Sequence, residues 1–195
     1  MKLPFVDVRA ASPSGLRAGT VWLAAALLAP AVLATGCASV EQHIVPAPAV
    51  LKDPRLDFAA QVPEALRSSV VPVFFATTRA KSDAAEHYAD RDGGGVTFGV
   101  ARVQLGEPGT SWDALMASHR ASSVDVPRPG SVVAVEELGR ASGAADAAAE
   151  QRFVAAIDAQ LALSPSKQLI VYVHGYRVSF DEVAVQMGSF SHYLG

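Results

Sequence analysis

The residues with the clearest chemical potential form a short loop near the C-terminal end, His174-Gly175-Tyr176-Arg177-Val178. The loop joins an apolar run, Gln168–Val173, to an amphipathic segment, Ser179–Leu194. A glycine beside a strand end allows the backbone to approach a ligand closely, and the N-terminus of a following helix adds positive potential. This combination suits the stabilisation of a developing oxyanion. A simpler interpretation is a turn after a strand, in which His174 is hydrogen-bonded locally.

Other motifs that would carry catalysis or hold a cofactor do not occur in the sequence. G-x-S-x-G is absent, as are the phosphate-binding patterns G-x-G-x-x-G and G-x-x-x-x-G-K-[ST]. The nearest approach, Gly188–His192, lacks the closing glycine and lies in a helical pattern, where neighbouring side chains point about 100° apart. The five histidines lack metal-ligand spacing, and Asp90–Gly95 departs from a calcium loop and reads as a flexible turn. We therefore expect no catalytic residue, no metal and no cofactor.

The first elements that must support the loop are strands. Their ranges are Val70–Ala76, Val96–Leu105 and Ser131–Glu137, each rich in β-branched or alternating apolar residues. Pro72 favours an edge strand because it cannot donate a ladder hydrogen bond. The apolar pattern changes phase near Gly99, which indicates a bulge.

The elements next to the loop indicate an α/β fold. Ala144–Leu163 has helical periodicity and ends before Pro165. Gln168–Val173 contains five consecutive apolar residues, which is typical of a central parallel strand that is buried on both faces. In the following helix, Ser179 and Glu182 have capping-box spacing. The sequence therefore predicts a few mixed strands followed by one parallel βα unit.

Three strings carry a resemblance to a known family. VPVFFATTRA (Val71–Ala80), FGVARVQL (Phe98–Leu105) and VYVHGYRVSFDEVA (Val171–Ala184) resemble the DUF900-type α/β-hydrolases of the esterase/lipase superfamily. The resemblance implies that the backbone N–H groups of Gly175 and Tyr176 are oxyanion-hole donors. It also implies that His174 and Arg177 are structural residues of the loop and that His174 is not the catalytic base. The family more often has asparagine at the position of Arg177.

The resemblance also implies what the chain does not contain. In a serine hydrolase of this fold the nucleophile, acid and histidine follow the oxyanion loop in that order. Only 20 residues follow Gly175, and one predicted helix occupies them. We therefore expect the N-terminal part of an α/β-hydrolase, truncated before the nucleophile elbow. The intact form would act on carboxylic esters or related acyl bonds; the alternative is a non-catalytic envelope lipoprotein with a binding or structural role.

The N-terminal region has the pattern of an export signal. Basic residues precede Val21–Thr35, an uncharged stretch of 15 residues, whereas a membrane-spanning helix needs about 20. The run Leu33–Cys37 resembles a bacterial lipobox, which implies that Cys37 becomes the lipidated first residue of the mature chain. Ala38 then favours the outer membrane, with the protein facing the periplasm. An ordinary signal peptide with an incidental cysteine is the alternative.

These observations divide the chain into a signal peptide (1–36), a Pro/Ala-rich tether (37–68) and a partial hydrolase domain (69–195). The tether assignment depends on four prolines without a periodic pattern, Pro46, Pro48, Pro54 and Pro63. The net charge of −3 gives no basic excess, so we expect no nucleic-acid partner. The expected partners are a membrane, through the lipid anchor, and an acyl-ester substrate of the intact form.

Overall fold

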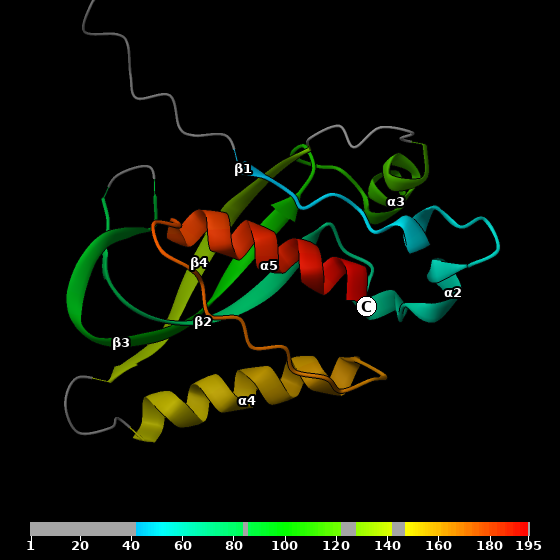
Figure 1. Cartoon of the computed structure of the whole chain (residues 1–195). Helices are drawn as coiled ribbons and strands as arrows, with labels where there is room; N and C mark the ends of the chain where they lie inside the picture. Colours follow the sequence, from blue (N-terminus) through cyan, green and yellow to red (C-terminus); the bar gives the residue numbers. More distant parts are fainter. Residues whose placement is uncertain (1–41, 84–85, 122–127, 142–146, 195) are drawn as a thin grey trace, which may run out of the picture. The chain divides into compact units, whose positions relative to one another are not determined.

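A four-stranded antiparallel sheet organises the protein (Figure 1). The computed structural model describes residues 42–83, 86–121, 128–141 and 147–194. The strands are β1 (Gln42–His43), β2 (Val70–Lys81), β3 (Tyr88–Leu105) and β4 (Pro129–Ala141), in the spatial order β1-β4-β3-β2. Each neighbouring pair runs antiparallel. The long strands are therefore consecutive in the chain and adjacent in the sheet, as in a meander.

The strand predictions are confirmed in position and in detail. The three predicted strands lie within β2, β3 and β4. β2 is an edge strand of the described sheet, as Pro72 predicted. The pairing of β3 with β4 shifts register between Phe98 and Gly99, where the change of apolar phase predicted a bulge. The expected turn at Asp90–Gly95 is wrong, because this run lies within β3 in a stretch whose pairing with β2 is irregular.

The larger helices are α3 (Trp112–Ala121), α4 (Ala147–Leu163) and α5 (Phe180–Leu194). Short helices lie at Ala49–Lys52, at α2 (Phe58–Gln61) and at Glu64–Leu66. Figure 1 shows α5 and α4 on opposite sides of the sheet. Alternate residues of β2 reach the two helices: the Phe75 ring lies 4.9 Å from that of Phe180 in α5, and the Phe74 ring lies 6.1 Å from that of Phe153 in α4.

The main core lies between the sheet and α5. Its fully or almost fully buried members come from the residue after β1, from β2 and β3, and from α3 and α5: Ile44, Val71, Tyr88, Ala101, Val103, Leu105, Leu115, Phe180, Ala184 and Val185. On the other face, α4 buries only Ala149 completely. The sheet is therefore firmly covered on one face and loosely covered on the other.

The predicted α/β fold with a parallel βα unit is wrong. Gln168–Val173 forms no strand and pairs with none of the described strands. Its apolar residues Leu169–Val173 are 48% to 86% exposed, where a central strand would be buried. A run of β-branched residues becomes a strand only if a neighbour accepts its backbone hydrogen bonds. The segment pairs with no described strand, even though the outer edge of β2 is unpaired, so composition alone did not decide the conformation.

The segment that we expected to be an extended tether packs onto the domain from residue 42 onward. Ile44 and Leu51 are buried, and the Ile44 N–H donates to the Arg128 carbonyl over 2.9 Å. The Val45 N–H donates to Ser189 Oγ in α5 over 3.1 Å, and Tyr193 Oη donates to the Val45 carbonyl over 2.6 Å. Residues 42–51 therefore contribute to the core. Among the described helices, none combines the length and apolarity that a membrane-spanning segment requires.

Candidate functional site

The loop His174–Val178 leads into a well-capped start of α5. Ser179 Oγ accepts a hydrogen bond from the Glu182 N–H over 3.1 Å, as the capping-box spacing predicted. The Glu182 carboxylate instead accepts from Gln186 Nε2 over 3.3 Å, one turn along the helix. Asp181 and Glu182 place two acids in the first turn of the helix, where they interact favourably with its dipole.

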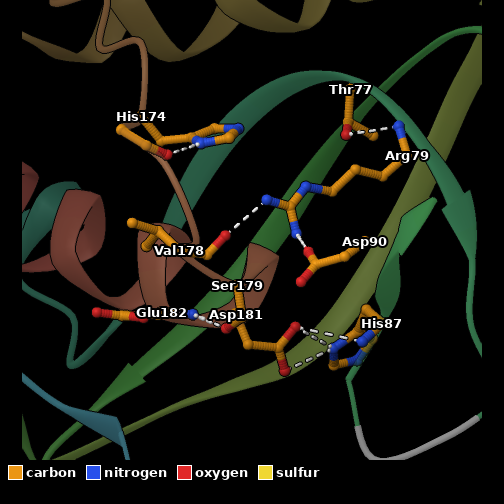
Figure 2. Close-up of polar contacts among 10 residues, drawn as sticks. Thr77, Arg79, His87, Asp90, His174, Val178, Ser179, Asp181 and Glu182 are labelled. Carbon is orange, nitrogen blue, oxygen red and sulfur yellow. Dashed lines mark hydrogen bonds and ion pairs between the residues drawn. The ribbon is translucent and has the colours of Figure 1, made fainter. Parts of the chain in front are cut away.

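The loop backbone carries two adjacent free donors. Within the described part of the chain, no hydrogen bond uses the N–H of Gly175 or of Tyr176. Tyr176 is 91% exposed, and a Cβ added at Gly175 would meet no atom within 4 Å. Figure 2 shows His174 turned back onto its own loop, with Nδ1 2.9 Å from the Gly175 carbonyl oxygen. Both donors are therefore open to an external acceptor.

Arg177 adopts an unusual backbone conformation, with φ of 59°. This left-handed region is costly for most side chains but is tolerated by asparagine and glycine. The structure thus gives a physical reason why asparagine would suit position 177 better than arginine does.

Arg79 of β2 connects the loop to the sheet (Figure 2). Its Nη2 donates to the Val178 carbonyl over 2.6 Å, and its other terminal nitrogen forms an ion pair with Asp90 of β3. The Arg79 side chain is 15% exposed, so the carbonyl contact is partly shielded from water. This contact holds the end of the loop beside the edge strand.

A histidine–carboxylate pair lies on the other side of the same junction, and sequence reasoning did not find it. His87 Nδ1 lies 3.0 Å from both carboxylate oxygens of Asp181, and the His87 N–H donates to the same carboxylate over 3.3 Å. Figure 2 shows the ring facing the first turn of α5. A histidine oriented by a carboxylate is one component of a catalytic triad. The Ser82 backbone N–H donates to the His87 carbonyl over 3.0 Å, and the His87–Asp181 pair fixes the start of β3 to α5.

The position of the loop relative to the sheet differs from our expectation. The loop does not emerge from a strand of the sheet, and residues 165–177 are all exposed. An oxyanion hole depends on donors that are held in place before the charge develops. Among the described residues, the contacts that hold the loop to its surroundings lie at its end, through Arg79 and Ser179.

An open groove of about 900 Å³ runs beside the loop. Its walls are β2, the apolar stripe Phe153, Ile157 and Leu161 of α4, the segment Gln168–His174, and α5. The outer edge of β2 has no hydrogen-bonded neighbour among the described strands. The groove therefore combines apolar walls with a row of unpaired backbone groups.

A second group of titratable residues is buried under the opposite end of α5. His119 of α3 is 0% exposed, and its ring centroid lies 5.5 Å from that of His192. No partner within the described residues reaches either His119 ring nitrogen or His192 Nε2. Burial, together with smaller contributions from positive charge on His192, Arg128 and Lys52, lowers the pKa of His119 to about 4. Burial alone lowers the pKa of His192 to about 4.

Neither region is a metal centre or a triad. In the part of the chain that the structure describes, no three His, Cys, Asp or Glu side chains lie close enough together to hold a metal ion. Ser189 is buried and donates to the Val185 carbonyl over 2.9 Å, so it is not an accessible nucleophile. Cys37, the predicted lipidation site, lies outside the described residues.

Comparisons with known proteins add no assignment: no family model, no curated protein and no solved structure matches the chain.

Proposed function

We propose that this chain supplies the anion-stabilising part of an exported, lipid-anchored serine hydrolase that acts on carboxylic esters or related acyl bonds. The backbone N–H groups of Gly175 and Tyr176 would bind the oxyanion, and no catalytic triad lies in the chain itself. Cys37 would carry the lipid that anchors the protein in the cell envelope, on the periplasmic side of the outer membrane.

The observation that carries this proposal is the pair of unpaired, accessible N–H groups directly before the capped start of α5. Adjacent backbone donors next to a helix N-terminus favour a negative charge. The left-handed φ of Arg177 gives further support, because the related loops more often have asparagine there. Residues 174–177 of the loop are exposed, so the proposal requires that the donors become ordered when the rest of the site is assembled.

The donors can be tested in the chain without any catalytic activity. Titration with methylphosphonate, an anion with oxyanion-like oxygens, should shift the Gly175 and Tyr176 amide signals in a ¹⁵N–¹H spectrum more than those of the remaining chain. Tyr176→Pro removes one donor and should weaken this binding, whereas Tyr176→Phe keeps the N–H and should bind as the original chain does. Uniform shifts, or equal binding by both variants, would contradict the assignment.

The absence of a triad has a separate test. The 195-residue chain should neither hydrolyse a short acyl ester above background nor react with a fluorophosphonate, which labels only an activated serine. Reading the gene beyond the codon for Gly195 then tests the hydrolase lineage. A downstream G-x-S-x-G followed by an acid and a histidine supports it, whereas a stop codon directly after Gly195 contradicts it for this product.

The second candidate is a non-catalytic envelope lipoprotein with a binding role. The apolar groove of about 900 Å³ favours it, because a soluble domain rarely leaves a continuous apolar surface of this kind without a partner. The two candidates differ in the phosphonate titration, which a purely binding role for the groove does not require.

A further inference from the structure

The strongest unexplained feature is a mismatch between two neighbours, the edge strand β2 and the segment Gln168–Val173. β2 presents an unpaired edge to the groove. Gln168–Val173 lines the same groove, is rich in β-branched and aromatic residues, and makes no hydrogen bond to any described strand. β2 thus has unpaired backbone groups, and Gln168–Val173 has the composition of a strand that could pair with them. Within one chain the two do not pair.

An extended polypeptide strand suits the groove better than a lipid or another small apolar molecule does. Apolar side chains of α4 and α5 would accept any apolar occupant. The unpaired N–H and C=O groups of β2 are satisfied only by an occupant that also donates and accepts hydrogen bonds along its length. An extended segment with apolar side chains meets both requirements.

We infer that the groove receives Gln168–Val173 of a second copy of this chain, so that two copies exchange these segments and form a twofold-symmetric dimer. The segment cannot fill the groove of its own chain, because it already forms one wall and is held between α4 and the Arg79–Val178 contact. A surface that carries both a projecting segment and its receptor closes on itself by a twofold axis.

The surface area is sufficient for a stable dimer. Residues Leu169–Val173 are 48% to 86% exposed, and burial of each such side chain removes about 100 Å² of apolar surface from water. Each copy contributes one segment and one groove wall, so the exchange buries roughly 2,000 Å² in total, which reaches the size of standard specific interfaces. This inference does not depend on the proposed hydrolase function.

The exchange is tested by the association state of the 195-residue chain in sedimentation velocity over a range of concentrations. We expect a reversible dimer. Val171→Lys places a charge on the segment, and Ala76→Lys places one on the exposed β2 side of the groove; each should raise the dimer dissociation constant at least tenfold. Val171 is 79% exposed and Ala76 is exposed, so both variants should keep the thermal unfolding midpoint of the original chain at a concentration where all three are monomeric.

A matched control and a mixing experiment identify the surface. Val154→Lys introduces the same charge at an exposed valine of α4 that does not line the groove, and it should leave dimerisation unchanged. In a mixture of the Val171→Lys and Ala76→Lys chains, one unsubstituted segment can meet one unsubstituted β2 edge. Native mass spectrometry should therefore detect a heterodimer at concentrations where each variant alone is monomeric.

Three results would overturn the exchange. The first is a monomer at every concentration. The second is a dimer that Val171→Lys and Ala76→Lys leave intact, since association would then use another surface or the apolar leader. The third is a mixture that shows no more heterodimer than either variant shows homodimer. If Val171→Lys changes the unfolding midpoint, Val173→Lys, at a position that is 86% exposed, replaces it in the same comparisons.

Discussion

The second half of β3, Val96–Leu105, and the segment Gln168–Val173 are both rich in apolar residues, but the first is largely buried and the second is exposed. Ala101, Val103 and Leu105 of β3 are completely buried between two strands and α5. Val171 and Val173 are 79% and 86% exposed. The difference lies in hydrogen-bonding partners, because β3 has a strand on each side and the segment has none.

This contrast shows that burial of an apolar strand is a property of the pair and not of the sequence alone. A strand in water keeps its backbone groups solvated, so apolar side chains remain exposed until a neighbour replaces that water. The two regions should therefore respond differently to the same mutation.

The largest difference is expected when leucine is replaced by alanine in β3 and in the segment Gln168–Val173. Leu105 is 0% exposed, and Leu105→Ala should lower the free energy of unfolding by about 3 kcal/mol through lost burial and a cavity. Leu169 is 59% exposed, and Leu169→Ala should change it by less than about 0.5 kcal/mol. Urea denaturation of both variants at a concentration where the chain is monomeric measures the difference. Equal losses would mean that the segment is packed as firmly as the sheet.

Lowering the pH should reduce the free energy of unfolding through the buried histidines of the packed region. The exposed segment Gln168–Val173 should not contribute to this pH dependence. The pKa of His119 is about 4 in the folded chain and near 6.5 when unfolded, so the unfolded chain binds more protons between these values. Stability is therefore complete above about pH 6.5 and falls as the pH drops toward 4, by at most about 1.4 kcal/mol per pH unit for one such histidine.

His119→Leu should reduce this pH dependence to the part that His192 contributes, and thermal unfolding between pH 7 and pH 4 measures it. His174→Leu, in the exposed loop, is the matched control and should retain the slope of the original chain. If His119→Leu also retains that slope, His119 does not account for the loss of stability.

Close approach of α5 to the sheet gives the next comparison. A Cβ at Gly188 would lie 2.9 Å from Val103 Cγ1 and 3.1 Å from Val71 Cγ2. Gly188→Val should therefore cost about 2 kcal/mol of unfolding free energy, since both contacts are with stiff strand residues. Gly175→Val meets open space and should cost almost nothing. A similar loss in both variants would show that α5 can shift away from the sheet at little cost.

Sequence patterns predicted the well-packed region better than the exposed one. The positions of β2, β3 and β4, the edge location marked by Pro72 and the bulge at Gly99 all follow from local residue order, and the structure confirms them. The alternation of apolar residues and the effects of turn-forming residues are local properties, so they can be recognised in the sequence without knowledge of distant partners.

The errors and omissions concern distant partners. Gln168–Val173 resembles a central strand in composition, but composition does not report whether a neighbouring strand exists. His87 and Asp181 are 94 residues apart in the chain, and no spacing pattern connects them. The capping-box spacing at Ser179 predicted the start of α5 correctly, but no local pattern indicated that Arg79 would hold the loop beside it.

The smallest expected effect concerns the contact of Arg79 with the end of the loop. Arg79→Met removes the hydrogen bond to the Val178 carbonyl and the ion pair with Asp90. Because Asp90 is 72% exposed, the ion pair contributes little, and most of the expected loss of about 1 kcal/mol comes from the partly shielded carbonyl contact. Amide hydrogen exchange on the monomeric chain should quicken at the first turn of α5 and remain unchanged in the middle of β3. Arg79→Lys keeps the charge but loses the forked geometry, so it should recover only part of the protection. If exchange instead quickens throughout the sheet, Arg79 stabilises the whole domain, and the loop is not a separately held region.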